Sequence, residues 1–279
     1  MGCDEFSCKS STDSGGCFSA TSLVRVRVRG PVEMQHLQVG DQVLTGIAGT
    51  YQYKPIYAFG HLNKDVMASF YAITTNVSNI PLEITGNHLV YLDGKFNPVR
   101  ADSLQVGDVL LSIKSPREIT AIDRVEKHGL YNPYTANGRL IVNDLAVSTY
   151  VALQADREYY QVGLENYQIR LFSHQQYSHL YLSPFRMLCM GVSSQLCQVF
   201  DEDGIPYWLS YGDAFVRWLG KQGVLVQLFF VLVTAPFCLV LLVVELLVGS
   251  TLAPIVMFVV GLLANTVQMS IVRTKRIAA

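Results

Sequence analysis

The chain of 279 residues is longer than one hydrophobic core usually needs, which predicts one domain of about 150 residues and a second part. Half of the residues are hydrophobic and only 15% are charged, a composition that is apolar for a soluble protein and predicts a membrane portion. A net charge of −1 argues against nucleic acid as a partner, and six scattered cysteines without C-x-x-C spacing argue against a zinc site or a dense disulfide framework. We expect no metal and no cofactor.

Residues 1–16 are rich in Ser, Gly and Asp and can bury little, so they are predicted to form a flexible leader. No apolar stretch typical of a secretory signal precedes Cys17. Between residues 17 and 150, short β-type runs alternate with turn residues and no helical pattern intervenes, which predicts an all-β domain. The predicted strands are 23–28, 42–45, 53–59, 67–74, 89–92, 109–113, 119–125 and 140–142 continuing to 150.

One phrase occurs twice in this domain, as "LQVGDQVL" at 37–44 and as "LQVGDVLL" at 104–111. Both copies follow a polar turn and lead into a strand, which suggests two pseudo-symmetric halves. The alternative is that Gly-Asp simply makes a convenient turn before a strand.

The remainder divides into three segments. Residues 151–221 are mixed and helical, with amphipathic stretches at 177–190 and 206–219. Residues 222–273 contain two apolar runs, 224–248 with Glu245 as its only charge and 252–272 with none; each is long enough to cross a bilayer. They predict an integral membrane protein with a two-helix transmembrane hairpin and a basic tail at 274–279; a buried hairpin of a soluble protein is the alternative.

The flanking charges predict an orientation. Arg217 and Lys221 precede the first run and Arg273, Lys275 and Arg276 follow the second, so the positive-inside rule places both ends and the β domain in the cytoplasm. Against this stands the sequon Asn76-Val77-Ser78, which is usable only if the domain is lumenal in the secretory pathway.

Gly16 and Cys17 are candidates for bond cleavage. A cysteine thiolate is a strong nucleophile, and a preceding glycine has no Cβ to shield its carbonyl. Attack of the Cys17 sulfur on the Gly16 carbonyl converts the peptide bond into a thioester, a step that needs an acid to protonate the departing nitrogen. In "TGNH" a tight Gly-Asn turn can bring the Thr85 hydroxyl and the His88 imidazole together, which makes His88 a candidate acid.

These motifs resemble the Hint module, the intein-like autoprocessing domain of Hedgehog proteins. The blocks "GCFSATS", "ITGNHLVYL", "LQVGDVLL" and "NGRLIVNDLAVSTY" follow in the family's order from Gly16 to Tyr150. The stretches "YSHLYLSPFRML" at 177–188 and "DGIPYWLSYGDAFVRWL" at 203–219 resemble the region that engages sterol in Hedgehog C-terminal domains. The resemblance implies a horseshoe-like, pseudo-two-fold all-β fold, whereas the membrane hairpin has no counterpart in it.

The resemblance also implies roles. Cys17 makes the N–S acyl shift, Thr85 and His88 activate the Gly16–Cys17 amide, and a second nucleophile, cholesterol in Hedgehog, releases the upstream segment. His61 stands where Hedgehog has an aspartate that assists the sterol, and it can serve as a base there. Thr149 stands where Hedgehog has a cysteine, so its contribution is uncertain.

The leading hypothesis is a membrane-tethered, single-turnover autoprocessing protein that acts on its own N-terminal segment and passes it to water, a sterol or another lipid alcohol. A second hypothesis is a non-catalytic, membrane-anchored scaffold that binds a lipid or a protein, motivated by the departures at His61 and Thr149. A small transporter has little support, because the two runs carry only one acidic residue, Glu245.

Overall fold

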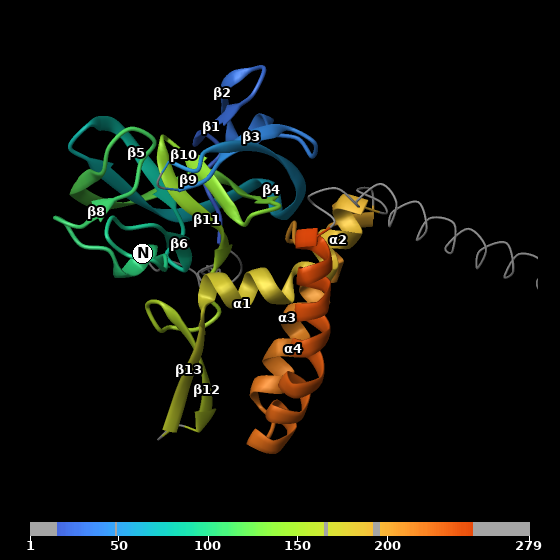
Figure 1. The fold of residues 1–279 in the computed structure, drawn as a ribbon. Helices are drawn as coiled ribbons and strands as arrows, with labels where there is room; N and C mark the ends of the chain where they lie inside the picture. Colours follow the sequence, from blue (N-terminus) through green and yellow to red (C-terminus); the bar gives the residue numbers. More distant parts are fainter. Residues whose placement is uncertain (1–15, 48, 165–166, 192–195, 248–279) are drawn as a thin grey trace, which may run out of the picture.

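The computed structural model describes residues 16–47, 49–164, 167–191 and 196–247 (Figure 1). The predicted leader up to residue 15, the second apolar run and the basic tail lie outside these residues. The β domain contains β1 (Leu23–Val26), β2 (Gly30–Glu33), β3 (Gln42–Thr45), β4 (Gln52–Thr75), β5 (Ser78–Ile84), β6 (His88–Val90), β7 (Val99–Arg100), β8 (Val109–Leu110), β9 (Arg117–Thr135), β10 (Arg139–Val142) and β11 (Leu145–Val151), with short 3₁₀ turns at Met34–His36 and Ala101–Ser103.

The prediction of a mainly β fold is confirmed, and one antiparallel sheet in the order β7-β6-β11-β10-β1-β3-β4-β9-β8 holds most of the domain together. The runs predicted as separate strands at 53–59 and 67–74 form one strand, β4, which pairs with β9 along almost its whole length. The register shifts between Asn63 and Met67, so the residues between the two predicted strands form an irregularity within β4. Such irregularities bend a strand without ending it.

The two copies of the repeated phrase have the same local structure. In each copy the aspartate carboxylate accepts a hydrogen bond from the glutamine N–H three residues earlier, and the glycine between them has a positive φ, at 96° and 93°, which favours glycine. The glycine N–H then donates to a strand carbonyl. The matching pairs are Gln38–Asp41 with Gln105–Asp108 (2.8 and 3.0 Å) and Gly40–Ile56 with Gly107–Ile119 (2.8 and 2.9 Å). A bare turn preference does not produce these identical tertiary bonds, so the geometry favours two related halves.

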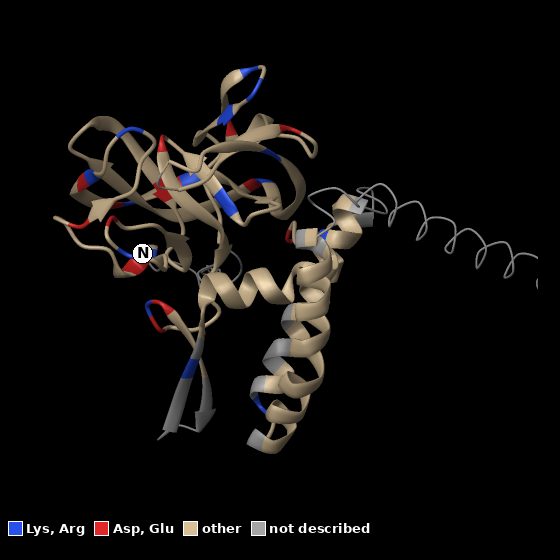
Figure 2. Cartoon of the chain, in the orientation of Figure 1, with Lys and Arg blue, Asp and Glu red and all other residues tan. Residues whose placement is uncertain are grey.

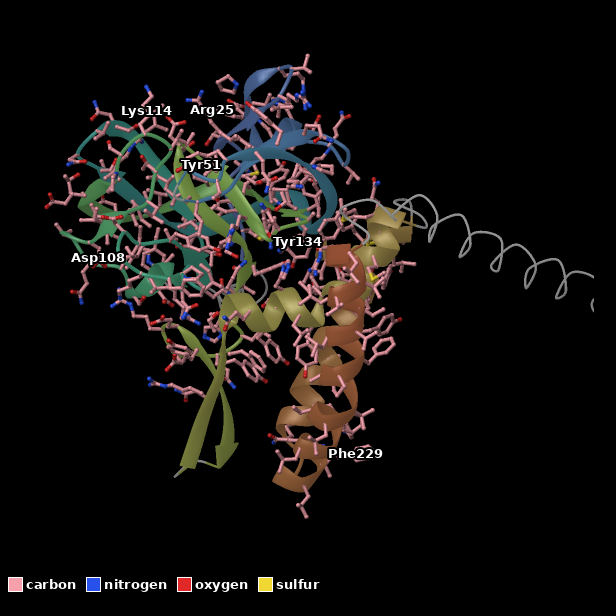
Figure 3. The ribbon with its side chains drawn as sticks, viewed as in Figure 1. Arg25, Tyr51, Asp108, Lys114, Tyr134 and Phe229 are labelled. Carbon is pink, nitrogen blue, oxygen red and sulfur yellow. A yellow bond between two sulfur atoms is a disulfide. The ribbon has the colours of Figure 1, made fainter. Side chains whose placement is uncertain are left out.

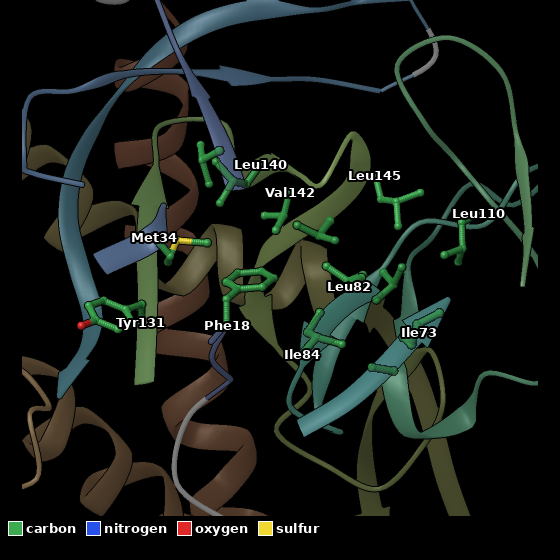
Figure 4. Packing of buried hydrophobic residues seen from close by; sticks show 14 of the residues in the cluster. Phe18, Met34, Ile73, Leu82, Ile84, Leu110, Tyr131, Leu140, Val142 and Leu145 are labelled. Carbon is green, nitrogen blue, oxygen red and sulfur yellow. The ribbon is translucent and has the colours of Figure 1, made fainter. Parts of the chain in front are cut away.

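Phe18 lies in the middle of the hydrophobic core, fully buried among residues of several strands (Figure 4). It forms bridges with both Tyr131 of β9 and Ile84 of β5, so it joins the two sides of the domain. Because Phe18 follows Cys17, burial of this one ring fixes where the preceding residue lies.

The region after the β domain is partly β, which the sequence did not predict. β12 (Tyr159–Leu164) and β13 (Tyr167–Ser173) form a hairpin apart from the main sheet, and are followed by α1 (His174–Tyr181), α2 (Ser183–Gly191), a 3₁₀ turn at Leu196–Gln198, α3 (Tyr207–Gly220) and α4 (Val224–Leu247). Ser173 and Gln176 make a capping box that starts α1 where the hairpin ends. The predicted amphipathic stretches 177–190 and 206–219 thus fall largely on helices.

α4 is the one helix in the described part of the chain that is long and apolar enough to cross a membrane, by length and composition. Most of its large side chains are exposed, among them Leu225, Phe229 and Phe237. Charged residues in Figure 2 gather on the β domain and its loops, whereas the part of α4 that is not drawn in grey has none. One candidate span is present where two were predicted, and the second run falls outside the described residues.

A disulfide links Cys189, near the end of α2, to Cys197. It lies in a second buried cluster together with Tyr57, Tyr134 and Tyr150. The sequence did not predict this bond, because a separation of eight residues carries no pairing signal of its own.

Candidate active site

Cys17 is fully buried at the start of the β domain. Its neighbour Phe18 exchanges main-chain hydrogen bonds with Tyr131, at 2.8 and 3.2 Å, so the backbone is held against β9 on one side. On the other side the Thr85 N–H donates to the Cys17 carbonyl at 3.0 Å. Gly16 is buried as well, so the Gly16–Cys17 peptide bond lies inside the domain.

The thiol of Cys17 faces a base. Burial raises its pKa well above the usual value, so the sulfur is protonated at neutral pH. The His61 Nδ1 atom lies 3.1 Å from Cys17 Sγ. The other ring nitrogen, Nε2, lies 2.9 Å from the carbonyl oxygen of Asp203. A carbonyl can only accept, so Nε2 carries the hydrogen and Nδ1 is left free to accept the thiol proton.

His61 is mostly uncharged at neutral pH, as a base that accepts the thiol proton must be. Burial lowers its pKa, and the Asp203 carbonyl and the charges of Asp201 and Asp203 partly oppose that effect. Its strand partner across β4 and β9 is Asn132, which is also buried.

Thr85 holds the Cys17 main chain at a second point. Its Oγ1 atom accepts a hydrogen bond from the Cys17 N–H at 2.9 Å and donates to Asn87 Oδ1 at 3.2 Å. The "TGNH" turn is closed by the His88 N–H, which donates to the Thr85 carbonyl at 3.2 Å. The departing nitrogen of the candidate cleavage reaction therefore already touches the Thr85 hydroxyl.

His88 lies on the Gly16 side of the same bond. Its Nε2 donates to the Ser148 carbonyl at 2.8 Å, and its Nδ1 lies against the Gly16 main chain without a hydrogen bond of normal geometry to any described residue. A Cβ atom placed on Gly16 would lie 2.5 Å from this Nδ1, so the glycine and the nitrogen are in close contact. Burial lowers the pKa of His88 to about 4, and the Ser148 and Gly16 backbones oppose this only in part.

Thr149 follows Ser148, whose carbonyl accepts the hydrogen bond from His88. The Thr149 hydroxyl is buried and has no hydrogen-bond partner among the described residues. No contact between Thr149 and Cys17 is recorded there. The structure thus brings Cys17, His61, Thr85 and His88 around the Gly16–Cys17 bond, with Thr149 on the adjacent β11 (Leu145–Val151).

Tyr134, labelled in Figure 3, is buried in the cluster that also contains Cys189 and Cys197 of the helical region, and it lies near Cys17. Burial raises its pKa, and nearby Tyr150 and Cys17 add to the effect. Gly60, next to His61, leaves room for this ring, because a Cβ there would lie 2.4 Å from the Tyr134 Cζ atom.

The groups that orient the two imidazoles could not be predicted from the sequence. They are the main-chain carbonyls of Ser148 and Asp203, which lie 60 and 142 residues from the histidines they hold. Every residue type has the same main-chain carbonyl, so the amino-acid sequence does not indicate which carbonyl accepts a hydrogen bond. No group of three potential ligands that could hold a metal ion is found in the part of the chain that the structure describes.

A family model and the sequences of similar proteins point to the same family. A model of the Hint module matches residues 5–207. Indian hedgehog B protein of Danio rerio is 30% identical over 163 residues, which are 52% of this chain and 39% of that protein. Sonic hedgehog protein of Xenopus laevis is 30% identical over 156 residues, 50% of this chain and 34% of that protein. This chain therefore corresponds to well under half of the length of these relatives.

Among solved structures, the gp41-1 intein covers 48% of this chain and 99% of its own, with 21% identity and a TM-score of 0.40.

The pKa of His88 predicts how stability depends on pH. The folded value of about 4 is below the unfolded value of 6.5, so the folded state binds fewer protons and stability falls as pH drops from about 6.5 toward 4. For His88→Gln we expect the loss between pH 7 and pH 4.5 in urea unfolding to be smaller than in the wild type by about 2 kcal/mol. The exposed β9 residue His128 supplies the control, His128→Gln, which should keep the wild-type loss. An equal loss in His88→Gln would contradict a buried, neutral His88.

Proposed function

Because this chain belongs to the Hint module family, whose Hedgehog and intein members are autoprocessing domains, we propose that it cleaves its own Gly16–Cys17 peptide bond through a thioester on Cys17. The observation that carries the proposal is the contact of 3.1 Å between Cys17 Sγ and the free Nδ1 of His61, next to an amide whose nitrogen is already hydrogen-bonded. It is a single-turnover reaction of the chain on its own N-terminal segment.

The first step moves one proton from sulfur to nitrogen. The Cys17 thiol passes its proton to His61 Nδ1 while Sγ forms a bond to the Gly16 carbonyl carbon. The bond between that carbon and the Cys17 nitrogen then breaks, and the nitrogen takes up a proton and becomes a free amine. Throughout, the Thr85 hydroxyl accepts the Cys17 N–H and keeps the nitrogen oriented.

His88 is the proposed acid. Its Nδ1 lies against Gly16 and has no other described partner, so a proton placed there is close to the bond that breaks. With a pKa of about 4, roughly one molecule in a thousand carries this proton at pH 7, and the imidazolium is a correspondingly strong acid.

The second step transfers the acyl group from Cys17 to an acceptor. His61 must first lose the proton that it took from the thiol. It then takes the acceptor's proton while the acceptor oxygen bonds to the Gly16 carbonyl carbon, the bond from that carbon to Cys17 Sγ breaks, and the sulfur takes the proton back from His61. Water, a sterol or another lipid alcohol each offer the hydroxyl. We leave Thr149 without a role in this step.

We further propose that α4 tethers the chain to a membrane, since it is apolar along its length and largely uncovered by the rest of the protein. The β domain is then placed on the lumenal or extracellular side. A disulfide such as Cys189–Cys197 persists in oxidising compartments and is rare in the cytosol, and this outweighs the charge bias around the apolar runs.

Cleavage is tested with an N-terminal tag and mass spectrometry after dithiothreitol, which intercepts a thioester. We expect cleavage after Gly16 in the wild type and none in Cys17→Ala. Thr85→Ala and His88→Ala should be slower by about 100- to 10,000-fold. Thr120→Ala, on the exposed surface of β9, is the control for Thr85→Ala and should cleave normally. An intact wild-type chain would instead support the non-catalytic scaffold.

The rate of cleavage should depend on pH through both histidines. His61 must be neutral and His88 protonated, so the rate should rise as pH falls from 8 toward 6.5, because more His88 is protonated. It should fall again in more acidic solution, where His61 is protonated as well. Single-turnover rates with dithiothreitol measure this profile. A rate that climbs steadily from pH 6 to pH 9 would show that ionisation of the thiol, without His61, controls the step.

Membrane tethering and compartment are tested together in eukaryotic cells. The chain should stay in the membrane pellet after carbonate extraction. A glycosidase-sensitive mass shift should be present in the wild type and absent in Asn76→Gln, because Asn76 lies exposed in the turn between β4 and β5. A soluble, unglycosylated chain would contradict both proposals.

A further inference from the structure

We propose that the turn at residues 201–205, here called the Asp201 turn, is a positioning element for His61 that fixes the ring hydrogen on Nε2 and so leaves the Nδ1 that faces Cys17 free to accept a proton. The inference rests on the proposed function, since it explains how His61 is kept ready as a base. It assigns a task to a segment that lies beyond the β domain and 142 residues from His61.

The turn reaches the histidine through its main chain. The Asp203 carbonyl accepts hydrogen bonds from His61 Nε2 at 2.9 Å and from the Asn63 side-chain amide at 3.2 Å. A third bond runs the same way, since the Leu62 N–H donates to the Gly204 carbonyl at 2.8 Å. Three successive residues of β4 therefore bind two successive carbonyls of the turn.

The turn is held in shape by the Asp201 carboxylate. One oxygen accepts from the Asp203 N–H at 3.1 Å and from the Ile205 N–H at 2.8 Å, and the other accepts from the Ser210 hydroxyl at 2.7 Å. Ser210 lies in the first turns of α3 (Tyr207–Gly220), so the carboxylate joins the turn to that helix. These hydrogen bonds together lower the pKa of Asp201 although its desolvation acts to raise it, so the carboxylate is charged at neutral pH.

Gly204 lets the turn approach β4 closely. Its φ is +83°, and a Cβ on it would lie 2.4 Å from the Leu62 carbonyl oxygen. Only a residue without a side chain allows both this conformation and this contact. The close approach brings the Asp203 carbonyl within hydrogen-bond distance of His61.

The consequence for His61 is specific. With Nε2–H bound to a carbonyl, the lone pair of the neutral ring is on Nδ1, 3.1 Å from the thiol. If the carbonyl moves away, the ring can place its hydrogen on Nδ1 instead, and that form cannot accept the thiol proton. In many proteins a hydrogen bond to the second ring nitrogen of a functional histidine fixes its tautomer.

The direct test is the tautomer of His61, read by ¹⁵N NMR of the full chain in detergent with labelled histidine. The Cys17→Ser background keeps a hydroxyl donor opposite Nδ1, mass spectrometry checks that the chain is intact, and His61→Gln assigns the signal. We expect the Nε2–H form alone at neutral pH. Asp201→Ala should give a mixture of both forms, whereas Asp201→Asn, which keeps an oxygen acceptor, should restore most of the Nε2–H form.

Cleavage rates in dithiothreitol complete the test, in the chain with Cys17 present. Asp201→Ala should be slower by about 10- to 100-fold, and Glu202→Gln, which alters the exposed neighbouring carboxylate, should match the wild type. If Asp201→Ala does not fold, Ser210→Ala removes one of the three bonds to the carboxylate and should show the same changes to a lesser degree.

The outcomes separate the two proposals. An unchanged tautomer in Asp201→Ala overturns the positioning role, even if cleavage slows, because the effect is then only structural. A mixed tautomer in a chain whose wild type never cleaves upholds the positioning role and refutes the proposed function.

Discussion

The long antiparallel pairing of β4 with β9 is the constraint on which the rest of the molecule depends. It sets His61 beside Asn132 and leaves Tyr131 free to bind the backbone of Phe18, which bridges to Ile84 on the other side. Cys17 is thereby placed between β9 and the end of β5, with its side chain fully buried. The chemistry proposed at this point needs no moving part to assemble it, because folding of the core already brings nucleophile, base and amide together.

The distribution of charge distinguishes two parts of the chain. Ion pairs and charged loops cover the β domain, while α4 offers apolar side chains to its surroundings (Figure 2). The disulfide from Cys189 to Cys197 and the buried cluster around Tyr57 and Tyr150 lie between these parts. The helical region is thus firmly attached to the domain, and through the Asp201 turn it also reaches the candidate site.

The sequence predicted the parts of this structure that local patterns record. Alternating apolar residues located β3 at its observed bounds, and turn residues located the "TGNH" turn that Thr85 and His88 share. It could not predict that β4 continues through the polar residues near Asn63, since this continuity comes from tertiary pairing with β9 and not from the local apolar pattern. The tautomers of His61 and His88 could not be predicted from the sequence either, because they are set by main-chain carbonyls, which every residue type has.

Burial of Cys17 has a consequence for timing. A thioester is inherently reactive toward water, but one formed on a sulfur with no solvent-accessible surface is shielded from the bulk. The acyl group on Cys17 would then be hydrolysed slowly. Its lifetime would depend on how often the surrounding strands and helices open far enough for a hydroxyl group to reach it. If α4 tethers the chain to a membrane as proposed, an apolar acceptor that reaches the site from the bilayer would compete with water more effectively than its bulk concentration alone suggests.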